Sequence, residues 1–119
     1  MKRVLVVDDS ATIRQQVSAA LTIAGFEVIE ATDGFEALSQ VRRGVGLVIC
    51  DVGMPKLDGL TMLEALHADP RWRDVPVLML TTQGQPELMA RARTAGAKGW
   101  IVKPFKAELL VAAVRQLAA

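Results

Sequence analysis

The sequence lacks several features that would indicate particular classes of protein. It has one cysteine, Cys50, which excludes an internal disulfide bond and is typical of a cytoplasmic protein. Its formal net charge is only +1, so neither nucleic acid nor an anionic membrane surface is expected as the main partner. No apolar run is long enough to span a membrane, and the one near Met1 is too short for a signal peptide. These absences predict a soluble, cytoplasmic protein.

Two further features of the sequence restrict the class of protein: a missing motif and a single histidine. The chain has no G-x-x-x-x-G-K-[ST] segment, the phosphate-binding loop of many nucleotide hydrolases, which argues against that class. Its only histidine, His67, lies near the end of a predicted helix. We expect His67 at a solvated surface position rather than in a ligand set.

The residues that are present form a repeating pattern within a length of 119 residues, which predicts one domain over 1–119. Short apolar runs rich in β-branched residues alternate with segments of helical periodicity. The predicted strands are 4–7, 26–31, 47–50, 77–80 and 100–102, and helices are expected after each of them. Such an alternation predicts an α/β fold, a doubly wound parallel sheet of five strands joined by right-handed crossovers. The second strand carries Glu27 and Glu30, which suit an edge of the sheet.

Polar residues follow four of the five predicted strands. They are Asp8 and Asp9 after the first strand, Asp51 after the third, Thr81 after the fourth and Lys103 after the fifth. Because the carboxyl ends of parallel strands lie along one edge, these side chains should meet there.

Each of these residues alone has an ordinary structural explanation. Asp8 and Asp9 could cap a helix, Thr81 could end a turn, and Lys103 could be a solvated charge. Together they are harder to explain, since carboxylates about 5 Å apart repel by roughly 3 kcal/mol at an effective dielectric constant near 20. An incomplete set of oxygen ligands of this kind suits Mg²⁺. With the metal, Asp51 could act as a nucleophile towards phosphorus, while Thr81 and Lys103 offset charge on the phosphoryl oxygens.

Four segments give the chain a clear resemblance to a known family. They are VLVVDDS (4–10), DVGMPKLDG (51–59), LTT (80–82) and GAKGWIVKPF (96–105). In order and spacing they resemble the receiver domain of bacterial two-component response regulators, over essentially the whole chain. The resemblance implies a flavodoxin-like (βα)5 fold with strand order 2-1-3-4-5, the doubly wound order for which the chemotaxis receiver is a standard example.

The resemblance also assigns roles at the site. It implies that Asp51 is the phosphoacceptor and takes a phosphoryl group from the phosphohistidine of a sensor kinase. Mg²⁺ would be held by Asp9 and Asp51 directly, by Asp8 mostly through water, and by the main-chain carbonyl of Gly53.

The remaining roles concern the response to phosphorylation. The resemblance implies that Thr81 and Lys103 bind the phosphoryl group, that Trp100 is an aromatic switch residue, and that the bond before Pro104 is cis. It also implies that positions 53 and 83, here Gly53 and Gln83, help to set the lifetime of the aspartyl phosphate. Gly53 stands where many members carry a polar side chain, and Trp100 replaces the commoner Tyr or Phe.

The resemblance implies a signalling protein rather than an enzyme with several substrates. Trp100 within GWIVKPF, after LTT, looks most like the stand-alone chemotaxis receivers, which are monomers. The expected partners are then a chemotaxis-type histidine kinase, a flagellar motor switch protein and a phosphatase. Alternatives are a receiver fragment of a larger response regulator, a phosphate sink, and a Mg²⁺-dependent aspartyl-phosphate phosphatase.

Overall fold

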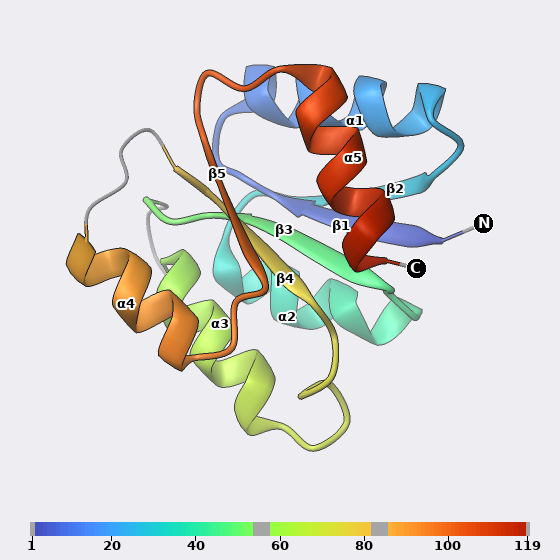
Figure 1. Ribbon diagram of the computed structural model, residues 1–119. Helices are drawn as coiled ribbons and strands as arrows, with labels where there is room; N and C mark the ends of the chain where they lie inside the picture. The colour runs from blue at the N-terminus through green and yellow to red at the C-terminus, as the bar shows by residue number, and fades with distance from the viewer. Residues whose placement is uncertain (1, 54–57, 82–85, 119) are drawn as a thin grey trace.

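The computed structural model describes residues 2–53, 58–81 and 86–118 (Figure 1). The strands are β1 (Arg3–Val7), β2 (Glu27–Ala31), β3 (Leu47–Asp51), β4 (Val77–Thr81) and β5 (Gly99–Val102). The helices are α1 (Ala11–Ile23), α2 (Gly34–Gln40), α3 (Gly59–Ala68), α4 (Pro86–Thr94) and α5 (Ala107–Leu117), with a 3₁₀ turn at Val41–Arg43.

The strands form one parallel sheet in the order β2-β1-β3-β4-β5. Helices α1 and α5 cover one face of the sheet, and α2, α3 and α4 cover the other (Figure 1). This arrangement confirms the predicted doubly wound α/β fold and its strand order. The carboxyl ends of β1 and β3 are in register, with Val7 opposite Cys50, so the residues that follow them lie at the same edge.

The burial of each strand follows its composition. All residues of β3 and β4 are buried, as uninterrupted apolar runs predict for strands covered on both faces. β2 lies at the edge, and its glutamates are exposed. Glu27 pairs with Arg3 at 3.1 Å, and Glu30 pairs with Arg14 of α1 at 3.2 Å. The edge position predicted from these two glutamates is confirmed.

Local capping signals fix the ends of the helices. The hydroxyl of Ser10 accepts a hydrogen bond from the Ile13 N–H at 3.3 Å, and the carboxylate of Asp58 accepts one from Thr61 at 2.9 Å. Gly25 and Gly96 follow α1 and α4 with φ of 98° and 100°, the left-handed conformation that glycine adopts most easily. None of the described helices is both long and apolar enough to span a membrane.

Candidate functional site

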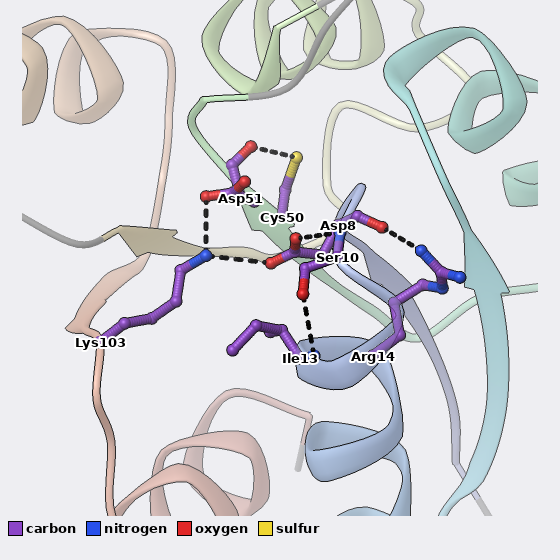
Figure 2. A network of polar contacts seen from close by, with 7 residues as sticks. All are labelled: Asp8, Ser10, Ile13, Arg14, Cys50, Asp51 and Lys103. Atoms are coloured by element: carbon purple, nitrogen blue, oxygen red, sulfur yellow. Dashed lines mark hydrogen bonds and ion pairs between the residues drawn. The ribbon is translucent and has the colours of Figure 1, made fainter.

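The carboxyl edge of the sheet gathers the polar residues that follow the strands. Asp51 is the last residue of β3 and Asp8 follows β1; both are buried. Carboxylate oxygens of Asp8, Asp9 and Asp51 all lie within 4.8 Å of one another. The Nζ of Lys103, which follows β5, lies 3.1 Å from Asp8 Oδ2 and 3.2 Å from Asp51 Oδ1, so it bridges the two carboxylates (Figure 2).

The end of β3 is held by its neighbours on both sides. The Val52 N–H donates to the Leu80 carbonyl of β4, and the Gly59 N–H donates to the Val52 carbonyl, both at 3.1 Å. A Cβ at position 59 would overlap the main-chain carbonyl of Asp51, so only glycine lets α3 begin this close to the site. This contact was not predicted from the sequence. The signal was a glycine, a poor helix former, at the first position of a helix.

The turn between β1 and α1 orients Asp8. The Ser10 N–H donates to Asp8 Oδ1 at 2.9 Å, and Arg14 donates from Nη1 to the Asp8 carbonyl at 2.7 Å (Figure 2). The role of Arg14 was missed, because an arginine on the first turns of a surface helix is usually solvated. Arg14 therefore fixes the main chain beneath the acidic cluster.

The electrostatics of the site favour a cation. Burial raises the pKa of Asp8; the Ser10 N–H lowers it, the Asp51 carboxylate raises it again, and the net result is above the usual value. For Lys103, burial lowers the pKa of the ammonium, but the Asp51 and Asp8 carboxylates outweigh burial and raise it overall. Lys103 therefore stays charged, and one ammonium faces three carboxylates.

The donor set fits Mg²⁺. The three carboxylates offer hard oxygen ligands, and Asp9 is exposed at the open side of the cluster, where water can complete a coordination shell. Gly53, whose main-chain carbonyl is a further predicted ligand, lies exposed on the loop after β3. Among the described residues other than its chain neighbours, no heavy atom lies within 4 Å of where a Cβ at Gly53 would be.

Cys50 is next to Asp51 but is not a reactive thiol. It is fully buried, and its Sγ lies 3.4 Å from the Asp51 carbonyl. Burial and then the nearby Asp51 carboxylate raise the thiol pKa well above its usual value. Cys50 is a small core residue.

The other predicted site residues lie on β4 and β5. Thr81 ends β4 and is 7% exposed, and Trp100 on β5 is half-buried opposite Met79. The Trp100 Nε1–H is buried and finds no hydrogen-bond partner among the residues the structure describes. The Lys103–Pro104 peptide bond is cis. Gln83, predicted to tune the lifetime, lies outside the described residues.

One prediction is wrong. His67 was expected at a solvated surface position, but it is half-buried and both of its ring nitrogens contact main-chain carbonyls. The expectation failed because the two acceptors, Val75 and Ala95, are distant in sequence and carry no side-chain signal.

Comparison with known proteins agrees with this geometry. The family model for the response regulator receiver domain matches residues 4–115. A curated relative, the DNA-binding dual master transcriptional regulator RpaA of Synechocystis, is 38% identical over 118 residues, which are 98% of this chain and 49% of the relative. The chain spans about half the length of the curated relatives it matches, which include the probable transcriptional regulator ycf27 of Pyropia yezoensis at 41% identity over 98% of this chain and 47% of the relative.

Solved structures are similar over their full length. The chemotaxis protein CheY4 of Vibrio cholerae is 41% identical, with a TM-score of 0.94 over 98% of both chains. A putative response regulator from Chloroflexus aurantiacus is 35% identical, with a TM-score of 0.93 over 98% of this chain and 97% of that one.

Proposed function

The chain belongs to the response regulator receiver domain family of two-component systems, and we propose that Asp51 is its phosphoacceptor. The observation that carries this proposal is the position of Asp51. It ends a fully buried strand, its carboxylate lies within 4.8 Å of those of Asp8 and Asp9, and it contacts Lys103 at 3.2 Å. A nucleophile held in this way can be presented in line to a phosphoryl donor.

Receiver domains accept phosphoryl groups from histidine kinases and interact with downstream targets, and they are not enzymes in the usual sense. In the step proposed here, a carboxylate oxygen of Asp51 forms a bond to phosphorus while the bond from phosphorus to the kinase histidine breaks. The bonding electron pair returns to that histidine's nitrogen. A carboxylate nucleophile has no proton to lose in this step, so the step needs no general base.

The other site residues would hold charge around the transferring group. Asp8, Asp9, Asp51 and the Gly53 carbonyl would hold Mg²⁺, which neutralises charge on the phosphoryl oxygens when bound. Lys103 stays protonated and can move from the two carboxylates to a phosphoryl oxygen.

The structural change on phosphorylation of Asp51 would involve Thr81 and Trp100. A phosphoryl group on Asp51 would draw the Thr81 hydroxyl towards it and free space for Trp100. The Trp100 N–H is buried without a partner among the described residues, which costs about 1–3 kcal/mol, so a rotamer that pairs this N–H competes with the one described. Phosphorylation would then change the face formed by α4, β5 and α5, which binds other proteins.

We further propose that residues 1–119 are one receiver domain, acting in the cytoplasm as a monomer of the chemotaxis type, without nucleic acid or membrane partners of its own. Full-length similarity to a chemotaxis protein supports this assignment. Its partners would be a chemotaxis-type kinase, a flagellar motor switch protein and a phosphatase. A second candidate is the receiver of a longer regulator, favoured by curated relatives of about twice this length that regulate transcription. A phosphate sink would use the same site.

The decisive experiment is direct labelling. The protein is incubated with acetyl phosphate and Mg²⁺, and the intact mass is measured for one added phosphoryl group. We expect labelling of the wild type, and none after Asp51→Asn or after removal of the metal. Asp58→Asn is the matched control, because it changes the next aspartate along the loop while keeping a residue that caps helices well.

Two outcomes would contradict the proposal. Labelling that persists in Asp51→Asn would place the phosphoacceptor elsewhere. Release of phosphate over many turnovers would instead favour a Mg²⁺-dependent phosphatase. That alternative is weak, since such enzymes carry a second acid two residues after the nucleophile, where this chain has Gly53. The class of partner is tested by titrating this protein with a flagellar motor switch protein, with and without beryllofluoride as a substitute for the phosphoryl group on Asp51. For a receiver of the chemotaxis type, we expect binding to be stronger with beryllofluoride.

A further inference from the structure

One side chain fastens the C-terminal end of α4 to two other elements. His67 lies in the last turn of α3. Its Nδ1 is 2.9 Å from the main-chain oxygen of Ala95, directly after α4. Its Nε2 is 2.8 Å from the main-chain oxygen of Val75, two residues before β4. A single imidazole therefore joins α3, the entry to β4 and the end of α4.

The chemistry of these two contacts determines the protonation of the ring. Carbonyl oxygens only accept hydrogen bonds, and a neutral imidazole has a single N–H to donate. With one proton, the second nitrogen would point its lone pair at a carbonyl oxygen at hydrogen-bonding distance, which is repulsive. Two protons make both contacts hydrogen bonds to a charged donor, which are stronger than neutral ones.

We infer that His67 is a positively charged clasp, an imidazolium that holds the C-terminal end of α4 against α3 and β4 and does so only while it carries both protons. The partial negative charge at the C-termini of α3 and α4 favours this cation. The clasp would make the stability of this corner of the molecule depend on whether the ring carries one proton or two.

In the described part of the chain, the His67 ring nitrogens contact the two main-chain carbonyls rather than a charged side chain. The charged side chains on the three elements that meet at His67 and on their adjoining turns are Glu64, Asp69, Arg71, Arg73, Asp74, Glu87, Arg91, Arg93 and Lys98. Glu64 pairs with Arg91 at 2.7 Å, and Asp69 pairs with Arg71 at 2.8 Å. Within the described part of the chain, no ion pair joins a carboxylate to His67.

The main chain next to the ring is shaped to admit it. A Cβ on Gly96 would lie 2.7 Å from His67 Nδ1, closer than side chains normally approach. Gly25, which follows α1, has nearly the same φ, 98° against 100°, but no described residue other than its chain neighbours lies within 4 Å of its Cβ position. The two glycines share a conformation, and only Gly96 also makes room for an imidazole.

The clasp also deepens the proposed function, and this step rests on that proposal. α4 begins at Pro86, on the side of the molecule where β4 ends at Thr81, and it ends at the clasp. With this end pinned, a movement of α4 on phosphorylation would be a pivot about Gly96. The start of the helix would then move more than its end.

The protonation of His67 can be measured directly. The chain has one histidine, so ¹⁵N-labelled protein gives a single pair of imidazole nitrogen signals. At neutral pH, without metal, we expect both nitrogens to show the chemical shifts of protonated N–H groups. A ring with one bare nitrogen under these conditions would overturn the clasp.

A second measurement asks whether the clasp stabilises the fold. His67→Gln removes the titratable ring, and its unfolding is compared with that of the wild type in urea from about pH 5.5 to about pH 8.5. Both hydrogen bonds exist when two protons are bound, so the loss in midpoint should be largest at the acid end and shrink as the pH rises. A loss independent of pH, or one that grows towards alkaline pH, would contradict the inference.

The glycine pair provides a test that does not depend on titration. Gly96→Ala should lower the urea midpoint clearly more than Gly25→Ala, because both strain φ but only the first displaces the imidazole. In a His67→Ala background the two glycine substitutions should cost about the same. Equal losses in the wild-type background would argue against the clasp.

The pivot is tested separately from the ring. Main-chain amide shifts are recorded with and without beryllofluoride and Mg²⁺. Leu88 and Met89, near the start of α4, should shift strongly, and Gly96 and Ala97 should shift little. Equal shifts at both ends would overturn the pivot. No shift anywhere in the protein would instead count against the proposed function, while the ring measurement would still decide the clasp.

Discussion

The central strands and β5 present their site residues in different ways. Every residue of β3 and β4 is buried, whereas β5 has three half-buried residues and ends in Val102, which is 48% exposed. Asp51 and Thr81 thus end well-packed strands, while Trp100 and Lys103 are carried by a loosely packed one. Under the proposed function, the phosphoacceptor Asp51 lies on the well-packed part, and Trp100 and Lys103, two of the three groups that would respond, lie where local movement costs less.

The prediction with the largest expected effect compares an isoleucine in β3 with one in β5. Ile49 in β3 is fully buried, and Ile101 in β5 is half-buried. We expect Ile49→Ala to lower the free energy of unfolding by about 3 kcal/mol, since it leaves a cavity in a core that cannot collapse. Ile101→Ala should cost about 1 kcal/mol, because less apolar surface is lost. Urea denaturation measures both, and equal costs would remove the distinction between the strands.

A smaller and opposite effect is expected at the carboxylates of the same edge. Asp8→Asn should raise the free energy of unfolding of the metal-free protein by on the order of 1 kcal/mol, what is left of a repulsion that Lys103 partly offsets. It should also weaken Mg²⁺ binding. The three carboxylates would thus lower the free energy of unfolding, whereas the buried core residues of the adjacent strand β3 raise it.

The raised pKa of Asp8 determines how the stability gained by Asp8→Asn depends on pH. Burial, with a further contribution from Asp51, leaves the pKa of Asp8 above its unfolded value of 3.8. The folded protein therefore holds that proton more tightly, and its stability falls as the pH rises from 3.8 through the raised pKa. Asp8→Asn should remove this slope, so the gain in stability is full at neutral pH and absent in strong acid. Urea midpoints of the wild type and of Asp8→Asn, measured in EDTA at about pH 4 and at neutral pH, would show this difference in slope. If Asp8→Asn were less stable than the wild type at neutral pH, the raised pKa of Asp8 would be contradicted.

The fold and most of the site could be predicted because their signals are local or follow from topology. The β-branched runs at 4–7 and 47–50 predict buried parallel strands, and a parallel sheet brings Asp8, Asp51 and Lys103 to one edge without any further information. Ser10 and Gly25 mark their helix ends by side-chain chemistry and backbone conformation alone.

The features that were missed are contacts with main-chain groups of other segments. His67 contacts the carbonyls of Val75 and Ala95, and Arg14 contacts that of Asp8. Every residue has a carbonyl, so nothing in the sequence distinguishes these acceptors. Gly59 is similar, since the reason for it is the main chain of Asp51. Side-chain chemistry at the strand ends was predictable, but the main-chain contacts that position it were not.

The last prediction uses the two tryptophans and involves the smallest energy. Trp100 lies on β5 and Trp72 lies in the turn after α3, with the Arg71 guanidinium 4.1 Å from its ring centroid; both rings are half-buried and pack against the same core cluster. In Trp72→Phe protein only Trp100 emits, and we expect its fluorescence to change on treatment with acetyl phosphate and Mg²⁺. In Trp100→Phe protein only Trp72 emits, and its spectrum should stay the same. The Trp100 N–H has no partner among the described residues, and pairing it would favour the change by about 1–3 kcal/mol, which is enough to shift populations. A response from Trp72 with none from Trp100 would contradict the assignment of Trp100 as the tryptophan that moves on phosphorylation.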